Sequence, residues 1–309
     1  MKRALITGSR GFVGPYLKRE LESSGFDVFG LGKESREEEG YYQADITDTQ
    51  RLLDVVREVG PTHIAHLAGI GSPVIAEANP KLTEHVQVDG TRNLLSAAAR
   101  LAAPPRILLV SSAYVYGAPQ YLPIDEDHPT EANNVYARAR LAQEAEAVRF
   151  QQIPIVIARS FNHTGPGQPD TFVIPKMAKQ IVEISLGRRR QFELGNIDVR
   201  RDITDVRDVA RAYRLLLTGE EESVIVNVCR GQSILLRDVI AQLARTAGLG
   251  DLTINTDQRV ARSNDPIEIC GSHEKLTRLT GWQPQISYEQ MLQDMFHYWW
   301  AAINNVRSS

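Results

Sequence analysis

The chain has 309 residues, of which 42% are hydrophobic and 24% are charged, a composition typical of folded globular proteins and not of disordered ones. Its 35 basic and 38 acidic residues give a formal charge of −3. This balance argues against nucleic-acid and membrane-surface binding, which both need a basic excess. Two cysteines, Cys229 and Cys270, cannot form a disulfide framework, and no apolar run approaches the roughly 20 residues that span a bilayer. With no signal-peptide pattern at the N-terminus, we expect a cytoplasmic protein.

The first half of the chain alternates short apolar runs with helical patterns. Strands are expected at residues 4–7, 27–31, 63–67, 106–110 and 153–158. Helices are expected at residues 16–23, 50–59, 90–101 and 135–150. Strands separated by helices form right-handed βαβ units, so this half predicts an α/β fold with a Rossmann-type doubly wound parallel sheet covered on both faces.

After Gly165 the pattern changes, because residues 165–169 read Gly-Pro-Gly-Gln-Pro and cannot continue a helix or a central strand. The elements expected beyond them are helices at residues 175–186, 206–217, 236–247 and 288–303, with strands at 191–194 and 224–228. We therefore predict a nucleotide-binding domain over residues 1–164 and a smaller, mixed α/β substrate lobe over residues 165–309. A segment at about 196–230 is expected to return to the first domain.

Three glycines lie between the first expected strand and the first expected helix. Gly8 permits a tight turn, Gly11 lets backbone amides approach a pyrophosphate, and Gly14 lets the helix pack closely on the strand. The phosphates then lie at the helix N-terminus, where free N–H groups and the helix dipole favour negative charge. No Gly-Lys-Ser/Thr follows, which disfavours a P-loop nucleotide hydrolase. The loop therefore predicts a bound dinucleotide.

The end of the second expected strand bears on the choice between NAD and NADP. An acidic residue there binds the ribose 2′-hydroxyl, whereas basic residues accept a 2′-phosphate. No carboxylate directly follows this strand, while Lys33, Ser35 and Arg36 lie just beyond it. NADP is therefore favoured over NAD.

Nearly the whole chain resembles the extended short-chain dehydrogenase/reductase family. The motifs that carry the resemblance are the glycine loop, Asp45-Ile46, His66-Leu67-Ala68-Gly69, Ser111-Ser112-Ala113-Tyr114-Val115-Tyr116-Gly117, the helix of Tyr136, and the segment from Arg159 to Gln168. Within the family the chain resembles the sugar-nucleotide branch, and most of all its reductases of GDP-linked 4-keto-6-deoxy-mannose. The resemblance implies that the cofactor contacts Gly8, Arg10, Gly11, Phe12, Val13, Gly14, Lys33, Ser35, Arg36, Asp45, Ile46, Leu67, Ala68, Gly69, Gln87, Tyr136 and Arg140.

The family mechanism implies three catalytic residues. Tyr136 would donate a proton to the substrate carbonyl oxygen as hydride arrives from NADPH, and Ser112 would hydrogen-bond the same oxygen. Arg140 lies one helical turn beyond Tyr136, where a cation can stabilise its ionised form. The family has Lys at this position, and a planar guanidinium makes different hydrogen bonds from an ammonium. Gln87 is a second departure, because relatives commonly carry Asn there.

Position 114 bears on the reaction type. In the related 4,6-dehydratases, an acid at this position removes the proton needed for elimination of water, whereas this chain has Tyr114. Reduction of a ketone, or epimerisation, therefore fits better than dehydration. For the substrate, the resemblance implies contacts from Ser112, Tyr114, Asn162, Lys176, Arg201, Arg262 and Asp265.

The leading hypothesis is thus an NADPH-dependent reductase that converts GDP-4-keto-6-deoxy-D-mannose to GDP-D-rhamnose. One alternative is an epimerase or dehydratase that recycles the hydride internally. Another is a sugar-nucleotide binder whose catalysis is impaired by Arg140. The resemblance also implies a homodimer, and we expect no bound metal.

Overall fold

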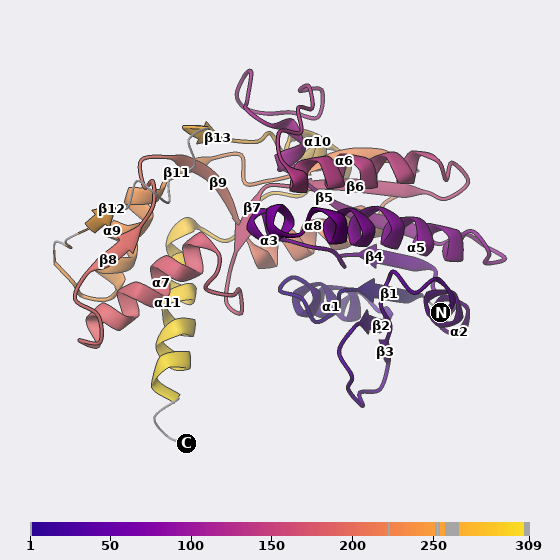
Figure 1. The fold of residues 1–309 in the computed structure, drawn as a ribbon, viewed down its shortest axis with the longest axis horizontal. Coiled ribbons are helices and arrows are strands. Elements are labelled where there is room, and N and C mark those ends of the chain that lie inside the picture. Colours follow the sequence, from indigo (N-terminus) through magenta and orange to yellow (C-terminus); the bar gives the residue numbers. More distant parts are fainter. Residues whose placement is uncertain (1, 222, 251, 253, 257–265, 306–309) are drawn as a thin grey trace.

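The computed structural model describes residues 2–221, 223–250, 252, 254–256 and 266–305 (Figure 1). Its largest element is a seven-stranded sheet in the order β10-β6-β5-β4-β1-β2-β3, with every neighbouring pair parallel. The strands are β1 (Arg3–Thr7), β2 (Asp27–Gly32), β3 (Tyr41–Gln43), β4 (His63–His66), β5 (Arg106–Ser112), β6 (Ile155–Ser160) and β10 (Val224–Val228). The predicted doubly wound parallel sheet is therefore confirmed.

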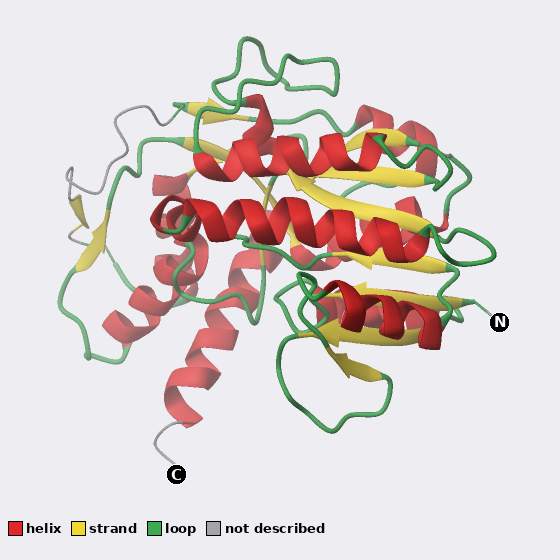
Figure 2. Cartoon of the chain, turned by 45° about the vertical axis from the view of Figure 1, so that its right-hand side comes forward, coloured by secondary structure: helices red, strands yellow, loops and turns green. Residues whose placement is uncertain are grey.

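Successive residues of each central strand enter opposite layers of core, because side chains alternate across a sheet. In β1, Leu5 joins one apolar cluster, whereas Ala4 and Ile6 join the other. The first cluster is covered by α2 (Thr49–Val59), α5 (Gly90–Ala98) and α6 (Val135–Val148). The second is covered by α1 (Gly14–Ser23), α8 (Val206–Thr218) and α10 (Glu274–Thr280). Figure 2 shows the sheet between these helices.

Helix ends follow local sequence signals. The Asp48 side chain accepts a hydrogen bond from the Arg51 N–H to start α2, and Gly60 ends it with a φ of +54°. The Asn134 side chain caps α6 in the same way, by accepting from the Ala137 N–H. The helix expected at residues 90–101 begins at Gly90 as predicted and ends at Ala98. Two short helices, α3 (Pro73–Ala78) and α4 (Pro80–Glu84), and a π-helical turn, η1 (His85–Asp89), precede α5. This turn carries Gln87.

The second lobe has two small sheets. In the first, β9 (Arg200–Asp205) pairs with β7 (Asn162–Thr164), β11 (Ser233–Leu235) and β13 (Glu268–Ile269); in the second, β8 (Phe192–Leu194) pairs with β12 (Ile254–Thr256). The helices are α7 (Val173–Ser185), α9 (Leu236–Thr246) and α11 (Tyr288–Asn305). They share a separate apolar core, at the left of Figure 1.

Parts of the second half return to the seven-stranded sheet. β10 forms its edge beside β6, and α8 packs on the face that α1 covers. Within the segment expected at about 196–230, β9 belongs instead to the second lobe. The chain also returns at α10, whose Leu276 lies in the same core as α8, and the Trp282 indole N–H donates to the Asp208 carbonyl at 3.0 Å.

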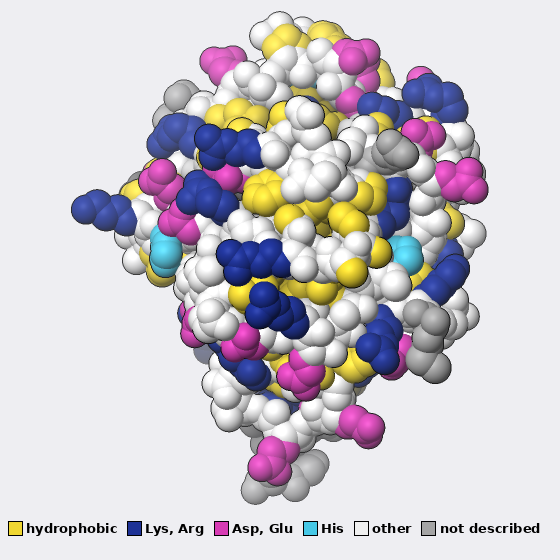
Figure 3. Space-filling model, turned by 90° about the vertical axis from the view of Figure 1, so that its right-hand side faces the viewer, with side chains coloured by type: hydrophobic (Ala, Val, Ile, Leu, Met, Phe, Trp, Pro, Cys, Tyr) yellow, Lys and Arg dark blue, Asp and Glu magenta, His cyan; other side chains and the backbone are white. Residues whose placement is uncertain are grey.

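The face at the right of Figure 1 carries basic and acidic side chains interspersed around apolar ones (Figure 3). Among the described helices, none has the length and apolar character needed to cross a membrane. The described part of the chain also holds no cluster of three or more His, Cys, Asp or Glu side chains arranged for a metal ion.

Candidate active site

All seven strands of the large sheet run parallel, so the segments that follow β1, β4, β5 and β6 meet at one edge. The glycine loop lies at this edge. The Gly8 N–H donates to the Leu31 carbonyl at 2.8 Å, and the Gly11 N–H donates to the Gly8 carbonyl at 2.9 Å. Gly8 has a φ of +68°, and a Cβ there would lie 2.8 Å from the Ala68 nitrogen. Only glycine fits this turn.

The start of α1 is open at the same edge. Val13 precedes the helix without a side-chain cap, and the first turn has no acidic residue. Within the first turn, the Gly14 and Tyr16 N–H groups donate to the Gly11 and Val13 carbonyls at 3.2 and 3.1 Å, and Pro15 has no N–H. The Phe12 and Val13 N–H groups, just before the helix, have no hydrogen-bond partner among the described residues and remain for a phosphate. A Cβ at Gly14 would lie 2.2 Å from the Ser9 carbonyl oxygen. The close contact that requires glycine here is with the loop and not, as the sequence suggested, with the strand.

Basic side chains follow β2, as predicted for a 2′-phosphate site, but they differ in their partners. The Lys33 ammonium pairs with the Asp45 carboxylate at 3.0 Å. Arg10 pairs with Glu38, and its guanidinium carbon lies 4.6 Å from the centre of the Tyr41 ring. Ser35 and Arg36 lie exposed in the loop that follows. Arg36 has no hydrogen bond or ion pair with the residues that the structure describes, so its charge is available to an anion.

Asp45 and Ile46 follow β3. Asp45 Oδ1 accepts hydrogen bonds from the Thr47 N–H at 3.0 Å and from its hydroxyl at 2.9 Å. Burial opposes ionisation of Asp45, but these bonds and Lys33 outweigh it and lower its pKa. Ile46 is buried against Gly90, where a Cβ would lie 2.6 Å from the isoleucine Cδ1. This contact joins the segment after β3 to α5.

Leu67, Ala68 and Gly69 follow β4. The Ala68 N–H donates to Thr7 Oγ1 at 3.2 Å, which ties this segment to the last residue of β1. Gly69 is exposed, and a Cβ there would lie 2.1 Å from Gln87 Oε1. Gln87 is fully buried, and its Oε1 accepts from the Ile70 N–H at 3.1 Å. The buried Gln87 amide thus holds the loop after β4 through this hydrogen bond.

Ser112 ends β5 and is 6% exposed. Its Oγ accepts a hydrogen bond from the Tyr114 N–H at 3.3 Å, at the start of the 3₁₀ turn η2 (Ala113–Tyr116). Because the backbone amide occupies an acceptor site of this oxygen, the serine hydroxyl proton remains for donation to another group.

Tyr136 lies in the first turn of α6 and is 6% exposed. The Tyr114 ring meets the Tyr136 ring edge to face, with 5.6 Å between centroids. Arg140, also 6% exposed, has its guanidinium carbon 5.2 Å from the centre of the Tyr136 ring. Ser112, Tyr114, Tyr136 and Arg140 therefore form one group, in which each contacts the next.

Arg140 uses its donors on the protein itself. Its Nη1 donates to the Val110 carbonyl at 2.9 Å and to Gln143 Oε1 at 3.0 Å, while Nη2 donates to the Ile70 carbonyl at 3.4 Å. The guanidinium therefore joins β5 and the loop after β4 to α6. It is placed as a fixed charge over the Tyr136 ring.

The predicted substrate residues lie where β6 leads into the second lobe. Asn162 begins β7, which pairs with β9 at Ile203, and Arg201 on β9 is 7% exposed. One Arg201 nitrogen donates to the Pro266 carbonyl at 2.9 Å. Lys176 is exposed and lies on the helix α7, not on β7 or β9. Arg262 and Asp265 lie outside the described residues.

The sequence did not assign a contact between the glycine loop and this region. The Phe12 ring stacks on His163, with centroids 6.0 Å apart and ring planes within 2°. His163 Nδ1 lies 3.0 Å from the Phe161 carbonyl, and burial lowers the pKa of this imidazole. A neutral ring donating from Nδ1 satisfies this geometry. Phe12 thus connects the glycine loop with the strand that carries Asn162.

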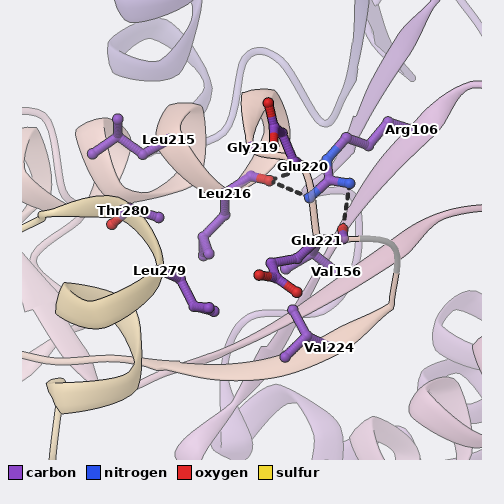
Figure 4. A pocket seen from close by; sticks show the side chains of 10 residues that line it. All are labelled: Arg106, Val156, Leu215, Leu216, Gly219, Glu220, Glu221, Val224, Leu279 and Thr280. Carbon is purple, nitrogen blue, oxygen red and sulfur yellow. Dashed lines mark hydrogen bonds between the residues drawn. The ribbon is translucent and has the colours of Figure 1, made fainter.

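Two cavities lie outside this group of residues. One of about 240 Å³ is lined by the first residues of β5 and β10, Arg106 and Val224, and by the end of α8 (Figure 4). It is at the amino-terminal edge of the sheet, opposite Ser112 and Tyr136. Arg106 also donates there to the Leu216 carbonyl at 3.0 Å. The other, of about 170 Å³, lies beside Ser9, Arg10 and Tyr41.

Comparison with known proteins identifies the family. The model for GDP-mannose 4,6 dehydratase matches residues 5–295. The chain belongs to the GDP-mannose 4,6 dehydratase family. This result confirms the predicted resemblance to the sugar-nucleotide branch of the extended short-chain dehydrogenases/reductases.

Within this family the chain is 34% identical to GDP-6-deoxy-D-mannose reductase from Pseudomonas aeruginosa, over 96% of the chain and 97% of that protein. It is 27% identical to GDP-mannose 4,6-dehydratase from Yersinia enterocolitica, over 96% of the chain and 93% of that protein. Among solved structures, RMD from Pseudomonas aeruginosa in complex with NADPH is 34% identical and superposes with a TM-score of 0.88. That match covers 98% of this chain and all of that one.

Proposed function

We propose that the protein is an NADPH-dependent reductase of GDP-4-keto-6-deoxy-D-mannose and that it forms GDP-D-rhamnose. The observation that carries the proposal is the grouping of Ser112 and Tyr136 around Tyr114, at the sheet edge where the glycine loop begins. The 34% identity to a GDP-6-deoxy-D-mannose reductase over nearly the full chain supports the substrate class.

The residues at this edge fit a dinucleotide. Glycine at positions 8 and 14 permits the close backbone contacts of the loop, and the Phe12 and Val13 N–H groups just before α1 are free to bind a pyrophosphate. Arg36 has its charge free for a 2′-phosphate, and Lys33 lies at the start of the same loop. The structural likeness to a protein in complex with NADPH supports the same choice of cofactor.

In this reaction the chain supplies a proton and positions the carbonyl group. NADPH, when bound, supplies the hydride for the carbonyl carbon. The Ser112 hydroxyl donates a hydrogen bond to the carbonyl oxygen, and Tyr136 transfers its phenolic proton to that oxygen to complete the alcohol. The Arg140 guanidinium stabilises the tyrosinate that remains. The balance is one ketone and NADPH consumed with one proton, giving one alcohol and NADP⁺.

Tyr114 favours reduction over dehydration. Elimination of water needs a base beside the sugar, and the resemblance places that base at position 114. Here the side chain is a phenol packed edge to face against Tyr136. It contributes an aromatic wall and no carboxylate, so a reductase remains the better match.

The test is to incubate the purified protein with NADPH and GDP-4-keto-6-deoxymannose and to follow the loss of reduced cofactor together with the sugar product. One NADPH should be oxidised for each sugar reduced. Tyr136→Phe should abolish most of the turnover while NADPH still binds. Product formed without net NADPH consumption would indicate an epimerase or dehydratase. Cofactor binding without any turnover would indicate a binding protein.

We further propose a homodimer and a cytoplasmic location. Family membership supports the homodimer, and sedimentation of the purified chain tests it. Cys229 and Cys270 are both free thiols, which is consistent with a reducing compartment. Fractionation of cells that produce the protein tests the location.

A further inference from the structure

Ile70, in the loop after β4, and four residues of η1, α5 and α6 form a closed circuit of hydrogen bonds. Its members, each bonded to the next, are Thr91, Gln87, Ile70, Arg140 and Gln143. The Thr91 hydroxyl donates to the Gln87 carbonyl at 2.6 Å, and Gln143 Nε2 closes the circuit by donating to Thr91 Oγ1 at 2.9 Å. The circuit joins the loop after β4, the π-turn η1, α5 and α6.

The circuit is almost inaccessible to water. Gln87, Thr91 and Gln143 are fully buried, and Arg140 is 6% exposed. Hydrogen bonds in such surroundings are stronger than in water, and an unpaired group costs more. A loss at one point therefore disturbs the other members of the circuit.

His66 fixes the direction of these bonds. The Thr91 hydroxyl proton is already directed to the Gln87 carbonyl, so Thr91 Oγ1 accepts from His66 Nε2 at 3.0 Å. His66 Nδ1 then accepts from the Thr7 hydroxyl at 2.7 Å. Burial, assisted by the Arg140 charge, lowers the pKa of His66 to about 3. The imidazole is thus neutral, with its proton on Nε2.

Both ends of one peptide segment are held by this circuit. Gln87 Oε1 receives the Ile70 N–H, and Arg140 Nη2 donates to the Ile70 carbonyl. Two buried donors of the same side chains, Gln87 Nε2 and Arg140 Nε, have no hydrogen-bond partner among the described residues. Gln87 Oε1 also lies 2.1 Å from the position that a Cβ of Gly69 would take. The two side chains therefore fix the position of the Gly69–Ile70 segment relative to η1 and α6.

We propose that Gln87 and Arg140 act as one coupled clamp on Ile70, which positions the Arg140 guanidinium over Tyr136 and the Gly69 segment against the cofactor. This inference rests on the proposed function. Lysine at position 140 cannot substitute, because the two guanidinium nitrogens reach three acceptors in a planar arrangement that a single ammonium does not reproduce. Asparagine at position 87 is one methylene too short to reach the Ile70 N–H.

The experiment is a double-mutant cycle with Gln87→Asn and Arg140→Lys, read as the dissociation constant of NADPH by fluorescence titration and as kcat and KM. Each single change should weaken NADPH binding by about tenfold, and the double variant should also lose about tenfold instead of a hundredfold, because either change opens the same circuit. Arg138→Lys, at an exposed position of the same helix, is the matched control and should bind NADPH as the wild type does.

A second pair of variants separates positioning from folding. Thr91→Val removes the hydroxyl that serves Gln87, Gln143 and His66 at nearly constant volume, whereas Thr91→Ser keeps it. Thr91→Val should lower kcat and weaken NADPH binding, and Thr91→Ser should restore both. Urea unfolding checks that each variant is folded. A variant that does not fold is replaced in the cycle by Gln143→Leu, which opens the circuit at another point.

Independent, multiplicative effects of Gln87→Asn and Arg140→Lys would overturn the clamp. So would equal kcat and NADPH affinity in Thr91→Val and Thr91→Ser. If the wild type binds NADPH but does not reduce the keto sugar, the proposed function is wrong while the cycle in NADPH binding still decides the clamp. If the wild type binds no NADPH, both proposals are wrong.

Discussion

Tyr114 and Tyr136 meet edge to face, with ring planes at 89° and centroids 5.6 Å apart. Tyr114 belongs to the turn that the Ser112 side chain caps, and Tyr136 lies in the first turn of the helix that carries Arg140. The aromatic contact therefore connects the turn after β5 with the start of α6. In the proposed reaction it would align Ser112 and Tyr136 on the same carbonyl oxygen.

The first prediction concerns this aromatic contact. Tyr114→Ala should lower kcat by roughly two- to tenfold, because an aromatic pair contributes about 0.5–1.5 kcal/mol to the placement of its members. Tyr114→Phe keeps the ring and should retain kcat within about twofold of the wild type. Steady-state kinetics on both variants provide the measurement. A loss of activity in Tyr114→Phe as large as in Tyr114→Ala would assign the role to the hydroxyl instead of the ring.

The second prediction concerns cofactor choice. Arg36→Ala should raise KM for NADPH by about tenfold and leave KM for NADH unchanged, because only NADPH presents a 2′-phosphate to this charge. Lys33→Ala should have a smaller effect, since Asp45 already balances the Lys33 charge. Kinetics with each cofactor test both variants. Parallel changes for NADPH and NADH would show that Arg36 does not select the phosphate.

The third prediction concerns a buried ion pair beside the site. Glu144 binds the Arg159 guanidinium through two nitrogens, at 2.8 and 3.1 Å, and also accepts from the Ser111 hydroxyl at 2.5 Å. Both charged residues are 6% exposed. Glu144→Leu leaves a buried unpaired cation and should lower the free energy of unfolding by about 3–5 kcal/mol.

The double variant Glu144→Leu/Arg159→Met is the control for this pair. It removes both charges, so it should recover a large part of the stability that Glu144→Leu loses. Urea unfolding of the three proteins gives the comparison. A double variant even less stable than Glu144→Leu would contradict this account of the pair.

The fourth prediction concerns acid stability. His66 has its pKa lowered to about 3 in the folded chain by burial and by Arg140, against 6.5 as its ordinary value. Below pH 6.5 the unfolded chain therefore binds a proton at His66 that the folded chain does not bind. The free energy of unfolding decreases as the pH falls from 6.5 toward 3. The slope from this residue is at most about 1.4 kcal/mol per pH unit.

His66→Gln removes that proton uptake. Urea unfolding at pH 6 and pH 5 should show a smaller loss of stability in the variant than in the wild type, by about 1 kcal/mol. The comparison uses the change with pH, so it holds even if the variant is less stable at both values. Equal changes with pH in the two proteins would mean that His66 is charged in the folded chain.

The sequence was sufficient for the features that depend on local patterns. The order of apolar runs and helical periods predicted the parallel sheet, and the glycines at 8, 11 and 14 marked the turn into α1. Resemblance to the family indicates Ser112 and Tyr136, and the structure brings both to the same edge of the sheet, where Tyr114 contacts each of them. Each of these signals spans few residues and is compatible with one local structure.

Features that depend on backbone acceptors distant in the chain could not be predicted. The sequence identifies Gln87 and Arg140 as unusual, but it does not show that both bind Ile70. Both bonds are to backbone groups of Ile70, which every residue type except proline has. The return of α10 to the large sheet was missed for a related reason: Leu276 is apolar wherever it packs. Similarly, no short-range signal assigned β9 to the second lobe.

The chain crosses several times between its two halves, and this limits where it can be truncated. A fragment that ended at residue 164 would lack β10, α8 and α10, and would bare the sheet face formed by Ala65, Leu108 and Val156. Such an apolar surface favours aggregation over an isolated, ligand-competent module. Attempts to express the cofactor-binding half by truncation should therefore give insoluble material. A split of this protein into independently folding halves would need to keep residues 206–228 and 274–282 with the N-terminal part.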